Sequence, residues 1–174
     1  MIRSFIIAIV TLLLLAACAS PPGTDPMKQR ASEFSSLGKK ALKKIIATSI
    51  YPAEVLAAKV RLNQTSWAEA FESSDQGRSD LGTVLGAVAL VRSPQPATET
   101  VVAACHRYIR RGDLSKIPEL CSLLVRFGDK ALAEDYINCG ESALYAAGAE
   151  WASNRGYNVR SGYGSHRVRW GQDR

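Results

Sequence analysis

The chain has 174 residues, of which 22 are basic and 16 acidic, giving a formal net charge of +6. This length allows one domain. The basic excess permits contact with anionic lipid, glycan or an acidic protein but is too small to demand any of them. The chain is therefore not one of the highly basic proteins that bind polyanions through their net charge.

The first 17 residues have the order of a secretory signal peptide. A basic residue, Arg3, precedes an apolar run broken only by Thr11, and Ala16 and Ala17 are small residues that suit a cleavage site. The run of about 13 residues is shorter than the roughly 20 that a membrane-spanning helix needs. We therefore expect residues 1–17 to be cleaved and not to anchor the chain.

Residues Leu15-Ala16-Ala17-Cys18 resemble the lipobox of bacterial lipoproteins. The resemblance implies that the Cys18 thiol receives diacylglycerol, that cleavage precedes it, and that the new amino terminus is acylated, for example with palmitate. Several acyl chains hold a protein at a membrane far more firmly than one. In Gram-negative lipoproteins an aspartate after the cysteine favours the inner membrane, so Ala19 implies the outer membrane, facing the periplasm. An ordinary signal peptide that ends near a cysteine is the alternative.

We divide the rest of the chain into a lipidated linker (residues 18–29), a helical domain (30–156) and a basic aromatic tail (157–174). Removing the signal peptide leaves 157 residues with a net charge of +5. The fold class is predicted as all-α, a compact helical bundle of about five to seven helices with a short C-terminal β-hairpin or ordered tail. Export from the cytoplasm argues against a nucleic-acid partner.

The first helical pattern covers residues 34–46. Its apolar residues fall on one face, and the opposite face carries Lys39, Lys40, Lys43 and Lys44. Such a helix beside a lipid anchor suits a membrane surface, which makes these lysines candidate membrane contacts. Alternatively, it is the first helix of the domain, with its apolar face in the core and its lysines in solvent.

Three local signals follow. Pro52 suits the first turn of a helix that runs to about Leu62, and Ser66 with Glu69 fits a capping box. Residues 81–91, LGTVLGAVALV, carry no charge on any face and are too few to cross a bilayer. They predict the core helix of the bundle; a buried strand and a membrane-inserting segment are the alternatives.

Glycines at 112, 128, 140 and 156 each come just after a helical pattern, where a left-handed residue commonly ends a helix. The first and third, and the second and fourth, lie 28 residues apart. Residues 112–156 therefore faintly resemble a helical-hairpin array of the HEAT or tetratricopeptide kind. This resemblance implies geometry only.

Three cysteines follow Cys18, and export would place them in an oxidising compartment. Their spacing and the presence of only two histidines make zinc a poor interpretation, so no metal site is predicted. Cys105 and Cys121 flank the turn at Gly112 at similar depths of an expected helical hairpin. We predict a Cys105–Cys121 disulfide, worth about 3 kcal/mol; two buried thiols are the alternative. Cys105 and His106 are not expected to form a nucleophile–base pair, because neighbouring helical residues point about 100° apart. His106 is expected to be an exposed histidine.

The C-terminal tail mixes arginine with aromatic residues, and residues 153–174 carry a net charge of +4. Arginine forks and aromatic rings suit carboxylates, phosphates and sugars, so peptidoglycan or anionic lipid are conceivable ligands. The candidate partner-binding residues are Arg160, Tyr163, Arg167, Arg169 and Trp170. The alternatives are docking on the acidic residues of the segment 129–150, which has a net charge of −4, and disorder.

No HExxH, P-loop or dinucleotide motif occurs in the sequence. No catalytic residue or cofactor is therefore predicted, and an enzyme is the less favoured class. The sequence predicts a lipid-anchored, periplasm-facing interaction or scaffold lipoprotein with a protein partner in the envelope, accessory to an assembly such as a secretion or conjugation machine. The alternative is a cell-wall-acting or cell-wall-binding protein that uses the basic aromatic tail.

Overall fold

The structure is a computed structural model that describes residues 26–160 and 169–172, with side chains placed for residues 26–159. Nine helices and two short strands lie in these ranges. The elements are α2 (Pro26–Ser36), α3 (Lys39–Thr48), α4 (Pro52–Arg61), α5 (Trp67–Asp75), α6 (Leu81–Leu90), α7 (Thr98–Arg110), α8 (Ile117–Phe127), α9 (Lys130–Asn138), α10 (Ser142–Ser153), β1 (Tyr157–Arg160) and β2 (Arg169–Gln172). The all-α prediction is confirmed at this level, and the predicted number of helices is too low.

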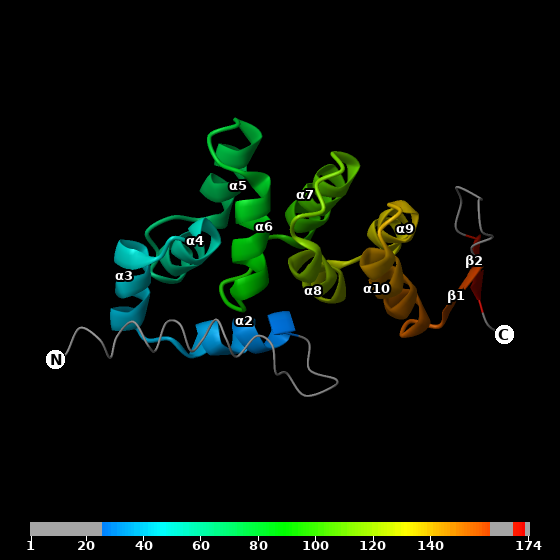
Figure 1. The fold of residues 1–174 in the computed structure, drawn as a ribbon, viewed down its shortest axis with the longest axis horizontal. Helices are drawn as coiled ribbons and strands as arrows, with labels where there is room; N and C mark the ends of the chain where they lie inside the picture. Colours follow the sequence, from blue (N-terminus) through cyan, green and yellow to red (C-terminus); the bar gives the residue numbers. More distant parts are fainter. Residues whose placement is uncertain (1–25, 161–168, 173–174) are drawn as a thin grey trace.

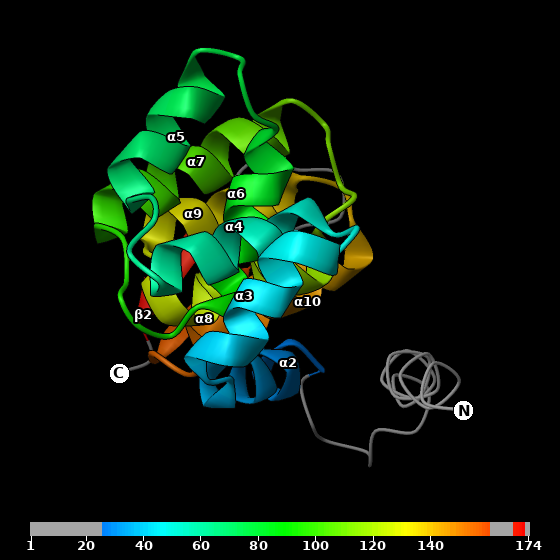
Figure 2. The same cartoon turned by 90° about the vertical axis from the view of Figure 1, so that its left-hand side faces the viewer.

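Successive helices form pairs that lie side by side along the long axis of the molecule: α3 with α4, α5 with α6, α7 with α8, and α9 with α10 (Figure 1). The second members contact one another in order, α4 to α6, α6 to α8 and α8 to α10. Figure 2 looks along this row from the α3 end. The helix α2 runs beneath the row and contacts α6 and α8.

The helix predicted over residues 34–46 is two helices in the structure, which partly explains the higher count. Gly38 is extended, with φ −80° and ψ 167°, and precedes α3. The guanidinium of Arg61, at the end of α4, donates to the carbonyl oxygens of Phe34 and Leu37. These bonds satisfy the last carbonyls of α2, which a continuing helix would otherwise satisfy. Helix α2 itself begins within the predicted linker.

The centre of the row is α6, where every residue except Thr83 is buried. Asp80 caps its start, accepting a hydrogen bond from the Thr83 amide at 2.7 Å. The helix contacts α2, α4, α5, α7 and α8, so apolar neighbours surround it on all sides. The prediction of a core helix over residues 81–91 is confirmed.

Two of the local signals are also confirmed. Pro52 is the first residue of α4. At the start of α5, the Ser66 hydroxyl accepts from the Glu69 amide and the Glu69 carboxylate accepts from the Ser66 amide, which completes the capping box. Both signals are local, because the partners are at most three residues apart.

The glycine pattern is confirmed at three of its four positions. Gly112, Gly140 and Gly156 have φ values of 71°, 83° and 72°. Gly128 is instead extended, with φ −63° and ψ 144°. A Cβ atom there would lie 2.3 Å from the Leu124 carbonyl oxygen, so close packing against α8, and not left-handed backbone, explains this glycine.

The two strands pair antiparallel, with Tyr157 opposite Gln172 and Arg160 opposite Arg169. Strand β1 contacts α10, the last helix of the row. The described start of the tail is thus attached to the end of the helical domain farthest from α3 (Figure 1).

Candidate functional site

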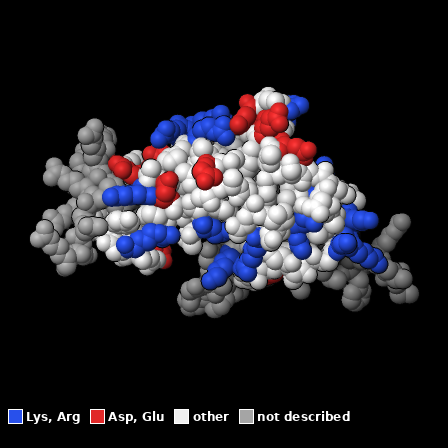
Figure 3. Space-filling model, turned by 180° about the vertical axis from the view of Figure 1, so that it is seen from behind, with Lys and Arg blue, Asp and Glu red and all other residues white. Residues whose placement is uncertain are grey.

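The end of the molecule formed by α3 carries a basic surface. The four lysines predicted from the sequence are all exposed on this helix, and residues 34–53 contain no acidic residue. None of these lysines makes an ion pair with another side chain of residues 26–159. In Figure 3 this end is at the right and carries several lysine and arginine side chains; other basic side chains lie along the lower side and at the top, beside the acidic group over α5.

The apolar face of α3 is not available to a membrane. Leu42 is buried, Ile45 and Ile46 pack partly buried against the core, and the helix contacts α4. The structure therefore uses α3 as a helix of the domain and leaves its lysine face outward. Any membrane contact by α3 has to be made by that face or by the turns beside it.

The turn between α3 and α4 exposes two large apolar residues, with 82% of Ile50 and 44% of Tyr51 accessible. Ser49 fixes this turn. Its hydroxyl donates to Glu54 Oε2 at 2.9 Å and accepts from the Tyr51 amide at 3.1 Å. Glu54 also lies 3.6 Å from the guanidinium of Arg30, so the nearest acid is already paired.

A hollow of about 290 Å³ lies between α3 and the end of α4. Its lining consists of Lys39, Lys43, Arg61, Leu62, Asn63 and Gln64. The two lysines are one helical turn apart and share this side of α3. Three cationic side chains and two amides surround the hollow without a carboxylate, which makes it chemically suited to a small anion such as a phosphate group.

The residue Asn63 shapes the rim of this hollow, because its φ of 54° ends α4 in the left-handed region. The Asn63 amide donates to the Val60 carbonyl at 3.0 Å, and the Gln64 amide donates to the Lys59 carbonyl at 2.9 Å. This pair of bonds is the usual closure of a helix by a left-handed residue. It fixes the backbone of both amide-bearing residues.

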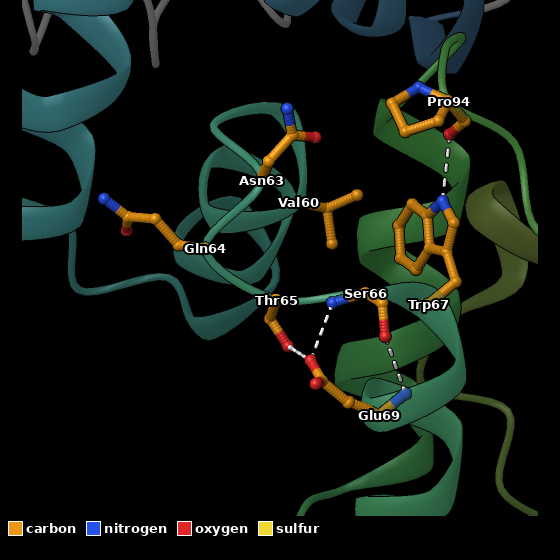
Figure 4. A pocket seen from close by; sticks show the side chains of 8 residues that line it. All are labelled: Val60, Asn63, Gln64, Thr65, Ser66, Trp67, Glu69 and Pro94. Atoms are coloured by element: carbon orange, nitrogen blue, oxygen red, sulfur yellow. Dashed lines mark hydrogen bonds between the residues drawn. The ribbon is translucent and has the colours of Figure 1, made fainter.

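A second hollow, of about 410 Å³, adjoins the first and shares Asn63 and Gln64 with it (Figure 4). The remaining lining residues are Val60, Thr65, Ser66, Trp67, Glu69 and Pro94. The Trp67 indole donates to the Pro94 carbonyl at 2.9 Å, and in Figure 4 the Gln64 side chain points away from this indole.

The single carboxylate of this lining, Glu69, is a helix cap. It accepts from the Ser66 amide at 2.8 Å and from the Thr65 hydroxyl at 2.9 Å. These hydrogen bonds, the Ser66 amide first, lower the pKa of Glu69 because they stabilise its charged form. The hollow therefore has no acid and base placed for proton transfer among the residues that line it.

A row of ion pairs joins the first members of three helix pairs. We use "charged ridge" for Asp75, His106, Arg107, Arg110 and Asp135, which lie on α5, α7 and α9. Arg107 bonds Asp75 at 2.6 Å, and Asp135 receives both His106 Nδ1 at 2.5 Å and Arg110 Nε at 3.2 Å.

The prediction that His106 is exposed is wrong. Only 17% of its side chain is accessible, because Asp135 of α9 holds the ring against the neighbouring helix. The partner is 29 residues away in sequence, so no local pattern could have identified it.

The predicted disulfide is absent from the structure, where Cys105 and Cys121 both carry thiols. The two residues face different neighbours. Cys105 is buried against the side chain of Tyr136 on α9, whereas the Cys121 sulfur lies 4.0 Å from the Ala143 carbonyl oxygen on α10. Burial raises the pKa of Cys105 to about 12, which disfavours its thiolate.

The predicted lipidation site, Cys18, lies outside the described residues. So do the side chains of the candidate partner-binding residues Arg160, Tyr163, Arg167, Arg169 and Trp170.

The described beginning of the tail packs through aromatic contacts. The Tyr157 ring stacks on Trp151 with centroids 6.2 Å apart. Lys130 Nζ lies 5.1 Å from the Tyr157 centroid, and the Arg155 guanidinium lies 4.1 Å from that of Trp151. These contacts between cations and rings attach β1 to both α9 and α10.

Within residues 26–159, no three His, Cys, Asp or Glu side chains are grouped to hold a metal ion. None of the helices in the described part of the chain is long and apolar enough to cross a membrane. No protein-family model, curated protein or solved structure matches this chain.

Proposed function

We propose that this chain is a lipid-anchored outer-membrane lipoprotein that faces the periplasm and serves as an interaction scaffold for a protein partner. In this proposal Cys18 carries the acyl chains and the helical domain holds the partner. An envelope assembly such as a secretion or conjugation machine is the setting that such an accessory protein fits.

The anchor is supported by the lipobox residues and by the chain length that follows them. Eight Cα–Cα steps separate Cys18 from Pro26, the first residue of α2. A chain of that length spans at most roughly 29 Å. Acylation of Cys18 would therefore hold the helical domain close to the bilayer.

The observation that carries the scaffold function is the row of helix pairs with the charged ridge along its first members. Stacked helix pairs bury their shared faces and expose an extended surface, which helical repeat proteins use to bind other proteins. Here ion pairs link α5, α7 and α9 along that surface. We infer that the partner binds along the ridge.

Site-specific crosslinking in the native envelope tests this function. A photoreactive residue replaces Ala103 or Ala131, both exposed and each one helical turn before a ridge residue, Arg107 and Asp135 respectively. We expect one discrete crosslinked protein from both positions. A probe at exposed Gln95, between α6 and α7, is the control. If the ridge positions give no adduct beyond that of Gln95, the scaffold function is wrong.

The anchor has its own test. In cells fed labelled palmitate, the wild-type protein should take up label and fractionate with the outer membrane, whereas Cys18→Ser should take up none and remain unprocessed. Normal processing and unchanged fractionation of Cys18→Ser would rule out lipidation, whatever the crosslinking result.

A further inference from the structure

We propose that the α3 end of the molecule is a docking surface for an anionic phospholipid bilayer. The four exposed lysines of α3 contact the headgroups, and the turn residues Ile50 and Tyr51 enter the interfacial layer. The inference deepens the proposed function, on which it rests for the presence of a nearby bilayer, and it fixes which end of the helix row faces that bilayer.

Charge complementarity supports a negatively charged partner. The lysine face of α3 has no acidic residue within the segment 34–53, and the adjoining hollow adds the guanidinium of Arg61 to Lys39 and Lys43. Lipid phosphates are anions of the size that such a hollow accepts. Each lysine near an anionic membrane surface contributes roughly fivefold to binding.

The exposed turn favours a bilayer over other anionic surfaces as the partner. Ile50 has 82% of its surface in solvent, although branched aliphatic residues usually lie inside proteins. Tyr51 combines an apolar ring with a hydroxyl, and this combination is enriched where bilayers meet water. A glycan offers no apolar layer for Ile50, whereas the boundary between headgroups and acyl chains does.

The turn is presented in a fixed conformation. Ser49 bonds both the Tyr51 amide and Glu54, and Arg30 pairs with Glu54 on its other oxygen. The charge of the nearest carboxylate, Glu54, is therefore balanced by Arg30, and Glu54 would repel an anionic surface less than an unpaired carboxylate would. Because α3 buries its apolar face against the domain, docking needs no unfolding of the helix.

The anchor and the docking surface are close in the chain. Helix α3 begins three residues after α2 ends, and α2 follows the proposed lipid attachment by the short connection described above. A domain held by this connection has its lysine helix near the membrane, so even a weak contact would be occupied through effective concentration.

Vesicle binding by the mature chain without its lipid, residues 19–174, tests the inference apart from lipidation. This chain keeps every described residue and hence the whole described core. We expect it to sediment with phosphatidylcholine vesicles that contain phosphatidylglycerol and not with pure phosphatidylcholine vesicles. Equal binding to both, or to neither, would overturn the proposal.

Matched variants then locate the surface. Lys40→Gln with Lys44→Gln, and Lys39→Gln with Lys43→Gln, should each lower the partition coefficient at least tenfold, with a smaller effect at high salt. The control is Arg78→Gln with Arg111→Gln, which removes the same charge from exposed positions elsewhere. If neither lysine pair weakens binding more than this control does, the docking surface is not on α3.

The turn has a control of its own. Ile50→Ser should weaken binding severalfold at low and high salt alike, whereas Val125→Ser, at a position on α8 that is 67% exposed, should not. An unchanged partition of Ile50→Ser, together with retention on isolated peptidoglycan, would replace the bilayer with a glycan partner. Loss of vesicle binding would leave palmitate labelling and ridge crosslinks intact, so the two proposals fail separately.

Discussion

The guanidinium of Arg126, on α8, lies 2.8 Å from the carbonyl oxygen of Val91, the residue directly after α6. It also donates to the carbonyls of Val88 at 2.9 Å and Ala89 at 3.1 Å. One side chain thus satisfies three carbonyls at the end of the most buried helix. Burial lowers the pKa of Arg126, but a guanidinium stays charged throughout the physiological range.

Replacing Arg126 with methionine should lower the free energy of unfolding by about 2–4 kcal/mol, because bonds to a charged donor are lost and carbonyls are left without partners. Arg126→Lys should recover only part of this loss, since an ammonium lacks the planar fork. Urea unfolding measures both. Arg111→Met, at an exposed position, is the control, and equal stability of the two methionine variants would contradict the capping role.

Gly148 in α10 should not tolerate alanine. A Cβ atom there would lie 2.8 Å from Ile137 Cγ1 and 2.9 Å from the Ala133 carbonyl oxygen, both on α9. Alanine favours helix formation by about 1 kcal/mol, but overpacking costs about 1–3 kcal/mol, so we expect a net loss of up to about 2 kcal/mol. Thermal unfolding of Gly148→Ala shows whether stability falls or rises. A raised melting temperature would show that α9 and α10 can move apart to accommodate the methyl group at little cost.

Stability should fall in alkali. Burial raises the pKa of Cys105 from 9.0 to about 12 and that of Tyr108 from 10.0 to about 12. Because the folded state holds these protons more tightly, their contribution is complete below pH 9 and is lost as the pH rises from about 9 to about 12. Urea midpoints across this range should decline, and Cys105→Ala should make the decline shallower. A slope unchanged by Cys105→Ala would mean that this thiol does not titrate as described.

The thiols should differ in reactivity. When the native protein is treated with an alkylating reagent at pH 8, Cys105 should react roughly a hundredfold or more slowly than Cys121. The reason is that the thiolate is the reactive form and Cys105 is buried. Peptide mass spectrometry measures each rate, with urea-unfolded protein as the control in which both react alike. Recovery of a linked Cys105–Cys121 peptide without reductant would restore the disulfide predicted from the sequence.

Removing the carboxylate of Asp135 should loosen α9 from α7. Asp135→Asn leaves His106 and Arg110 without the charge that both contact, and we expect a loss of about 1 kcal/mol, as is usual for part-exposed ion pairs. Hydrogen exchange in α9 should quicken at the same time. Glu150→Gln, at an exposed position on α10, should change neither quantity, and a similar effect of both variants would assign the loss to net charge alone.

The features that sequence predicted well are those whose causes lie within a few residues. The uncharged run at 81–91 predicts a buried helix from its composition alone, and the capping box consists of hydrogen bonds between Ser66 and Glu69, three residues apart. At the break between α2 and α3, Arg61 bonds two carbonyl oxygens that lie 24 and 27 residues away in the sequence. Such a contact exists only after the chain has folded, so periodicity joined the two helices into one.

The residues of the candidate site also fall into those that the sequence pattern identified and those that only the folded structure reveals. Amphipathic spacing identified the four lysines, since charge and period are properties of one helix. It could not identify Ile50, because its exposure depends on how the α3–α4 turn sits relative to the domain. The disulfide prediction failed for a related reason: equal depth in a hairpin does not fix which neighbour each thiol faces.

The way α2 is fastened bears on how the domain would respond to a pull from its amino-terminal side. Arg92 bonds the Lys28 carbonyl near one end of α2, and Arg61 bonds the carbonyls of Phe34 and Leu37 at the other. Along the same helix, Met27, Ala31 and Phe34 are buried. A pull at Pro26 would therefore act first on the Arg92–Lys28 hydrogen bond, and the buried apolar residues and the Arg61 hydrogen bonds would still hold the rest of α2 to the domain.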